Sequence, residues 1–166
     1  MYVTVVDGND RIIGSKHFDK LTNRDIYRVS ALWITNSKGQ VLLAKRQLGK
    51  RNDPGKWGPA VAGTVEDGES YERNMIKEAQ EEIGLSGTTF SMGPRVRNHS
   101  GPHQFFVQWF TCSVDWPIEK FKVQESEVKK IEWVSKNYLA KDLQKNPDRY
   151  VSSAQRIWND LLSWTW

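Results

Sequence analysis

Short β-prone runs separated by turn residues make up the first part of the chain. Segments 2–6 and 11–14 flank Asp7-Gly8-Asn9-Asp10, which predicts an N-terminal β-hairpin over residues 1–14. Segments 29–35 and 40–45 flank a second turn and predict a second hairpin. Further strands are expected over Thr88–Arg97, Gln104–Val114 and Val128–Val134.

Two segments carry a helical pattern instead. Apolar residues recur at helical spacing within residues 69–83, and Gly84 stands where a C-terminal cap belongs. Pro147–Trp164 predicts a closing helix, in which Trp158, Trp164 and Trp166 are interpreted as packing residues. The order of strands, helix, strands and helix favours an α/β fold with a mixed sheet. We expect one domain over residues 1–166.

Composition narrows the classes of protein that fit. Of 166 residues, 38% are hydrophobic and 27% are charged, which is typical of a globular protein, and no apolar run is long enough to span a bilayer. No secretory signal is visible at the N-terminus, so a cytoplasmic location is the simplest expectation. The net charge of +4 suits anionic partners. Because the charge is spread along the chain, a small phosphorylated molecule is favoured over nucleic acid.

Cys112 is the only cysteine, so the chain contains no internal disulfide and no cysteine-based zinc site. Its neighbours alternate as in a strand, and we interpret Cys112 as a small core residue rather than a nucleophile.

The strongest candidate chemistry is a group of glutamates in the predicted helix. Glu78, Glu81 and Glu82 stand at i, i+3 and i+4, so they share one face that borders the apolar face. A hard divalent cation would relieve the repulsion between them. Taken alone, however, three glutamates on a helix more often form a solvated face.

The residue pattern over the longer stretch Gly63–Leu85 favours a functional site over a solvated face, because this stretch resembles the Nudix box. The stretch keeps the spacing of that motif: a glycine, five residues, a glutamate, seven residues, a basic residue and then the glutamate pattern. The matching positions are Gly63, Glu69, Lys77, Glu78, Glu81, Glu82, Gly84 and Leu85. Lys77 replaces the usual arginine, and Ala79 is a small version of the first aliphatic residue.

The resemblance implies a Nudix α/β/α sandwich and a metal-dependent hydrolase that cleaves a diphosphate linkage. It carries over Glu78, Glu81 and Glu82 as metal ligands for Mg²⁺, with Mn²⁺ as a substitute, and Gly63 as a further ligand through its carbonyl. Glu81 and Glu82 are also the catalytic candidates. Glu69, Lys77 and Gly84 would be structural, with Glu69 paired to Lys77 although lysine lacks the planar fork of arginine. Homodimers are common in the family.

Outside the box, the chain is similar to the branch that contains isopentenyl-diphosphate isomerase and its hydrolase-like relatives. In the isomerase a cysteine precedes the box glycine and a histidine follows it, whereas this chain has Ala62 and Thr64. These departures favour hydrolysis of a nucleoside diphosphate derivative or a similar metabolite over isomerisation. A non-catalytic ligand-binding or RNA-binding Nudix domain is the third alternative, which the complete glutamate set disfavours.

Charged residues outside the box supply further candidates. Arg46, Lys50 and Arg51 lie in a basic loop that would hold substrate phosphates, unless it is only a solvated loop. Glu127, or less well Glu125, fits the family spacing for an extra general base or ligand, with an exposed acidic turn as the alternative.

Histidines and aromatic residues are less informative. His99 and His103 flank Ser100-Gly101-Pro102, where a loop or hairpin is predicted, and are interpreted as surface residues rather than substrate contacts. Four aromatic residues would either stack on a base or pack in the core, and the sequence leaves both alternatives open: Trp33, Trp57, Phe106 and Trp109.

Overall fold

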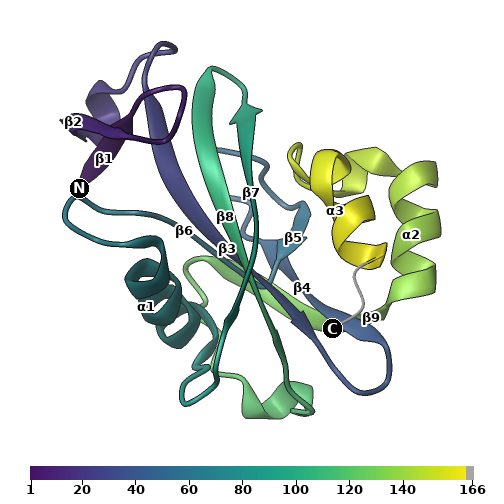
Figure 1. Cartoon of the computed structure of the whole chain (residues 1–166). Helices are drawn as coiled ribbons and strands as arrows, with labels where there is room; N and C mark the ends of the chain where they lie inside the picture. The colour runs from purple at the N-terminus through teal and green to yellow at the C-terminus, as the bar shows by residue number, and fades with distance from the viewer. Residues whose placement is uncertain (164–166) are drawn as a thin grey trace.

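The strand β3 (Ile26–Thr35) is central to the sheet in the computed structural model, which describes residues 1–163 (Figure 1). It pairs in parallel with β8 (His103–Ser113) along its whole length and antiparallel with β6 (Val61–Thr64). Nine strands of the described chain form one mixed sheet. The others are β1 (Tyr2–Val6), β2 (Ile12–His17), β4 (Gln40–Arg46), β5 (Trp57–Pro59), β7 (Ser91–Ser100) and β9 (Val128–Ser135).

The predicted N-terminal hairpin is confirmed as the antiparallel pair β1 and β2. Its second strand runs to His17, three residues beyond the predicted end, and the short 3₁₀ helix Phe18–Lys20 follows it. Asp10 in the turn has a positive φ of 62°. Its buried carboxylate accepts from Arg28 Nε and Arg95 Nη1, each at 2.7 Å, and these ion pairs fix the hairpin to the rest of the sheet.

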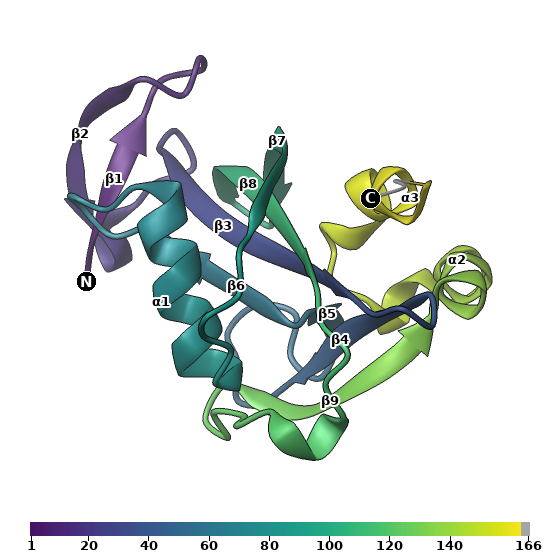
Figure 2. The same cartoon turned by 60° about the horizontal axis from the view of Figure 1, so that its bottom comes forward.

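Helices cover both faces of the sheet, so the predicted α/β/α sandwich is confirmed (Figure 2). α1 (Tyr71–Ile83) packs on one face with the even-numbered residues of β3, such as Leu32. α2 (Lys136–Lys145) and α3 (Ala154–Ser163) pack on the other face with odd-numbered residues, such as Trp33. The alternation of side chains along β3 therefore divides the core in two. None of the described helices is long and apolar enough to cross a membrane.

The predicted helix before Gly84 is confirmed because its local signals are strong. The Ser70 side chain accepts from Arg73 N at 3.2 Å, which caps the first turn. Gly84 ends the helix with a φ of 68°, a left-handed conformation that favours glycine, and its N–H donates to the last turn.

The predicted closing helix over Pro147–Trp164 is confirmed only in part, because its regular helix, α3, covers Ala154–Ser163. Residues 136–145 already form a helix, α2, which the pattern analysis missed, and Pro147–Arg149 is only a 3₁₀ turn. Tyr150 then adopts an extended conformation, so α3 begins at Ala154. Trp158 is fully buried in the core as predicted, whereas Trp164 and Trp166 lie outside the described residues.

Candidate active site

The turn between β6 and α1 brings the predicted box residues to one cavity. α1 buries its apolar face against the sheet, and its three candidate glutamates lie along the border of that face. Glu78, Glu81, Glu82 and Gly63 all line a cavity of about 500 Å³. The side chains selected from the sequence therefore meet in space at a single concave site.

Gly63 is required by the close approach of Glu78. A Cβ added to Gly63 would lie 2.7 Å from Glu78 Oε1 and would collide with the carboxyl carbon as well. Because the backbone is bare at this point of β6, the Glu78 carboxylate packs directly on the strand.

Burial and mutual repulsion act on the carboxylates of Glu78 and Glu82. Burial raises the pKa of Glu82 to about 8, and the negative charge of Glu78 adds to the shift, although Ala62 N donates to Glu82 Oε2 at 3.2 Å. Burial also raises the pKa of Glu78, and the charge of Glu81 adds to it. Concentrated negative charge of this kind is relieved by a bound cation.

The donor set fits a hard divalent cation in its chemistry, because carboxylate and carbonyl oxygens are the ligands that Mg²⁺ prefers. The three carboxylates do not converge on one point: within residues 1–163, no group of three or more His, Cys, Asp or Glu side chains is close enough to hold a metal ion. Glu81 is exposed, whereas Glu78 and Glu82 are half-buried.

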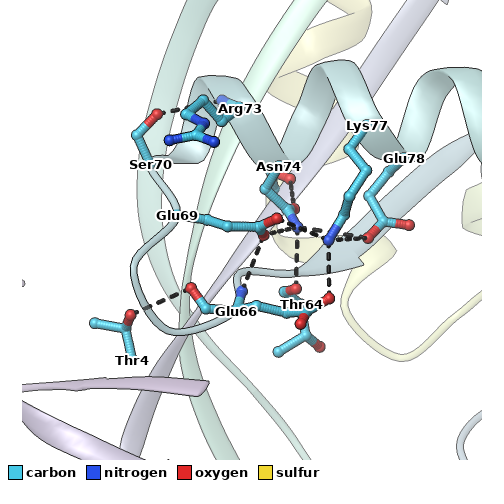
Figure 3. Close-up of polar contacts among 10 residues, drawn as sticks. Thr4, Thr64, Glu66, Glu69, Ser70, Arg73, Asn74, Lys77 and Glu78 are labelled. Carbon is cyan, nitrogen blue, oxygen red and sulfur yellow. Dashed lines mark hydrogen bonds and ion pairs between the residues drawn. The ribbon is translucent and has the colours of Figure 1, made fainter. Parts of the chain in front are cut away.

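Glu69 and Lys77 form the pair that the resemblance implied, within a larger polar network (Figure 3). Lys77 Nζ donates to Glu69 Oε1 at 2.8 Å and to Glu66 Oε1 at 2.9 Å. Burial alone would raise the pKa of Glu69, but hydrogen bonds from Lys77, Asn74 and the Glu66 N–H outweigh burial and lower it. The ammonium also lies 3.9 Å from Glu78 Oε1, so the network extends to the edge of the candidate site.

Asn74 is a member of this network that sequence analysis missed. It is completely buried, and its Nδ2 donates to Thr64 O at 3.1 Å and to Glu69 Oε2 at 2.9 Å (Figure 3). The Ser30 hydroxyl donates to its Oδ1. The available signal was a polar residue on the otherwise apolar face of the helix, since a buried amide must be hydrogen-bonded.

Two of the three basic loop candidates reach the cavity. Arg46 and Lys50 line it, whereas Arg51 is not among its lining residues and its side chain is 77% exposed. Arg46 Nε donates to Asn52 O at 3.1 Å, which fixes the guanidinium against the loop that follows β4.

Glu127 also lines the cavity, close enough to Glu82 for its charge to raise the pKa of that carboxyl group, and Lys50 Nζ forms an ion pair with Glu127 Oε2. Glu125 is not among the lining residues; its backbone carbonyl accepts from Gln47 Nε2 at 2.7 Å. The geometry therefore favours Glu127 over Glu125 as the additional carboxylate of the site.

The remaining candidates are mostly away from the cavity. Trp109 lines it, but Trp33 and Trp57 belong to the core. The His103 ring stacks on Phe18 with centroids 6.0 Å apart. His99 contacts Arg156 beside a separate surface hollow. Cys112 is partly buried against the core on the α1 side, and burial raises the pKa of its thiol to about 12.

An apolar floor, which sequence analysis also missed, forms the rest of the cavity. It consists of side chains from the parallel strands β3 and β8, at alternate positions that face α3 rather than α1. The floor residues are Tyr27, Val29, Ala31, Phe105, Val107 and Trp109. The cavity therefore combines a charged end with an apolar floor, and uncharged polar side chains such as Asn98 and Ser100 also line it.

A NUDIX domain model matches residues 26–155, so the chain belongs to the Nudix family. This confirms the resemblance that the box indicated. The chain is a Nudix hydrolase. Its family membership and its similarity to a prenyl-diphosphate phosphatase support the hydrolysis of diphosphate bonds in general. The predicted extent of the domain, residues 1–166, stays a prediction.

Similar proteins include both branches considered above. A prenyl-diphosphate phosphatase of Methanosarcina mazei is 30% identical over 90% of this chain and 88% of its own. An isopentenyl-diphosphate Delta-isomerase of Klebsiella pneumoniae is 24% identical over 80% of this chain and 75% of its own. The crystal structure of DR0079 from Deinococcus radiodurans superposes with a TM-score of 0.78 at 18% identity, covering 98% and 97% of the two chains, and shows the same fold.

Proposed function

We propose that this protein hydrolyses the diphosphate linkage of a small phosphorylated metabolite and requires Mg²⁺, for which Mn²⁺ substitutes. The observation that carries the proposal is the charged end of the cavity, where three box glutamates lie with Glu127 and two basic side chains. Carboxylates and cations arranged around one cavity suit a substrate that is itself polyanionic.

Glu78, Glu81, Glu82 and the Gly63 carbonyl are the groups proposed to hold the cation. The raised pKa values of Glu78 and Glu82 support this assignment, because a cation would return both groups to their charged form. When bound, the metal ion neutralises phosphate oxygens and makes a water molecule more acidic.

The basic side chains that line the cavity are proposed to bind and orient the substrate. Arg46 and Lys50 are proposed to donate charge-assisted hydrogen bonds to phosphate oxygens. Arg51, at 77% exposure, would contribute only to long-range attraction of the anion. In the reaction, water oxygen bonds to one phosphorus, the bridging P–O bond breaks, and the bridging oxygen leaves with the other phosphate. A carboxylate accepts the proton of the water, and Glu127, Glu81 and Glu82 are the candidates for this base.

Two classes of substrate are candidates, and each is suggested by a different observation. The family resemblance favours a nucleoside diphosphate derivative, whereas the name of the Methanosarcina mazei relative suggests a prenyl diphosphate as the second candidate. Isomerase activity is disfavoured, because Ala62 and Thr64 line the cavity where the isomerase has its cysteine and histidine. A purely ligand-binding function is disfavoured by the complete glutamate set.

The proposal is tested by incubating the purified protein with nucleoside and prenyl diphosphates, with Mg²⁺, with Mn²⁺ or with excess chelator. We expect phosphate release that requires the added metal. Absence of metal-dependent release from every member of both classes would contradict the proposed function.

A further inference from the structure

The floor of the cavity is built from side chains that face one another in register across two parallel strands. Tyr27 lies beside Phe105, Val29 beside Val107, and Ala31 beside Trp109. In a sheet, side chains at alternate positions share one face, so these three pairs form a continuous surface. The surface runs about 13 Å along β3, at about 3.3 Å per residue.

The floor offers few hydrogen-bonding groups to a substrate. The backbone of β3 pairs with β8 on one side and with β6 on the other, so its N–H and C=O groups are engaged. Among the floor side chains only Tyr27 and Trp109 carry a polar atom, and Trp109 Nε1 is buried out of reach. A nucleobase placed flat on these six side chains would lose hydrogen bonds to water, and only polar residues elsewhere in the cavity lining, such as Asn98 beside Phe105, could replace them.

The aromatic side chains of the floor are almost completely covered by neighbouring residues. Tyr27, Phe105 and Trp109 are 5%, 9% and 4% exposed, so none has a free ring face on which a base could stack. Val29, which is only half-buried, is more accessible at the centre of the floor. Contact with the floor is therefore aliphatic.

The floor lies beside the charged end. Val29 pairs with Thr64 of β6, the residue after Gly63, and with Val107 of β8. Neighbouring strands lie about 4.8 Å apart, so Val29 is one strand spacing from β6 and Val107 is two. A group attached to a diphosphate at the carboxylates would therefore reach Val29 first and Val107 next.

We propose that the floor is the binding subsite for the non-phosphate part of the substrate, that it takes a branched hydrocarbon chain in preference to a nucleoside, and that Val29 determines this specificity. The inference rests on the proposed function, which places the diphosphate at the charged end. Burial of aliphatic carbon on Val29 supplies the affinity, because an apolar chain loses no hydrogen bonds on entering.

Val29→Thr is the sharpest variant, since it keeps the shape of the side chain and replaces one methyl group by a hydroxyl. Val96→Thr is its matched control. Val96 pairs with Val107 on the far side of β8, is also half-buried against the same core, and is not among the residues that line the cavity. Both changes place a hydroxyl on one face of one sheet, so a general effect on stability would appear in both.

The experiment compares two non-hydrolysable probes, geranyl methylenediphosphonate and α,β-methylene-ADP, by calorimetric titration with Mg²⁺ into the full chain. We expect the geranyl probe to bind the parent at least about 10-fold more tightly. Val29→Thr should weaken its binding by about 10-fold and leave the nucleotide probe within about twofold, and Val96→Thr should change neither. Equal or tighter binding of the nucleotide probe to the parent, or equal effects of the two variants, would overturn the inference.

Turnover of geranyl diphosphate and of ADP is measured in parallel, because it separates the two proposals. Phosphate release from ADP alone would overturn the preference for hydrocarbon and leave the proposed hydrolysis intact. No release from either compound, together with tighter binding of the geranyl probe, would contradict the hydrolysis and support the floor as a hydrocarbon subsite. The parent protein alone decides the preference, so the inference stays testable even if Val29→Thr does not fold.

Discussion

Lys77 Nζ lies 2.8 Å from Glu69 Oε1, and this ion pair ties the middle of α1 to the turn that precedes it. The pair stands where the family uses an arginine. A single ammonium replaces the planar fork, and it contacts Glu66 at 2.9 Å as well as Glu69. Lysine therefore maintains the connection by bridging two carboxylates rather than by a bidentate contact with one.

The first prediction concerns this bridge. Lys77→Met should lower the free energy of unfolding by about 1–2 kcal/mol, because two partly buried carboxylates lose their charged donor. Lys77→Arg, which keeps the charge, should stay within about 0.5 kcal/mol of the parent. Urea unfolding followed by tryptophan fluorescence measures both variants. A Lys77→Met protein as stable as the parent would show that the network is not stabilising.

The second prediction concerns the candidate metal site. Glu82→Gln should reduce turnover about 100-fold or more while the fold is maintained, as expected for loss of a main electrostatic group. The control is Glu72→Gln, which removes an exposed carboxylate from the first turn of the same helix. Steady-state rates with Mg²⁺ are compared with circular dichroism spectra. Near-normal turnover of Glu82→Gln would remove Glu82 from the catalytic machinery.

Local signals explain which parts of the fold and site the sequence could predict. The apolar spacing of α1 and its end at Gly84 act within one helix, so the pattern indicated both the helix and the face that carries Glu78 and Glu82. Asn74 was missed because its partners, Ser30 and Thr64, belong to two different strands. Its importance depends on tertiary contacts that no spacing within the helix encodes.

Pairing between distant segments explains most of the features that the sequence did not predict. The floor requires β3 and β8 to align in parallel with Tyr27 beside Phe105, and these residues are far apart in the sequence. The pattern predicted both strands but not their register, because register depends on the whole sheet. α2 was missed although Ser135 caps it and Leu139 and Leu143 repeat at helical spacing, since only about one apolar residue per turn is buried.

The third prediction excludes isomerisation. Incubation with isopentenyl diphosphate and Mg²⁺ should yield no dimethylallyl diphosphate, because Ala62 cannot donate the proton that a cysteine supplies at this position. Proton NMR of the reaction mixture detects the product directly. Formation of dimethylallyl diphosphate at enzymatic rates would overturn the assignment to the hydrolase branch.

The fourth prediction concerns pH and the buried Asp142. The Tyr150 hydroxyl donates to Asp142 Oδ2 at 2.6 Å, and this bond, with those from Asn146 and Arg149, lowers the pKa of the carboxyl group. The stabilisation is therefore present above the unfolded pKa, near 3.8, and is lost as pH falls through the lower folded value. Asp142→Asn should be less stable than the parent by about 1–2 kcal/mol at pH 7, and the difference should shrink towards pH 3. Thermal unfolding at both pH values measures this, and a difference that does not change with pH would contradict it.

The fifth prediction distinguishes three basic side chains: Arg46, at the end of β4, and Lys50 and Arg51, in the loop that follows. Arg46 and Lys50 line the cavity and Arg51 does not, so Arg46→Ala and Lys50→Ala should each lower kcat/KM by about 10-fold, whereas Arg51→Ala should stay within about twofold. Lys50→Ala also removes the partner of Glu127, so its effect should extend to kcat.

The double variant of Arg46 and Lys50 should show a weaker dependence of kcat/KM on salt, because fewer cations attract the substrate. Initial rates at two salt concentrations measure all four variants. Equal, small effects at all three positions would mean that the loop is only a solvated surface and that the metal site alone holds the phosphates.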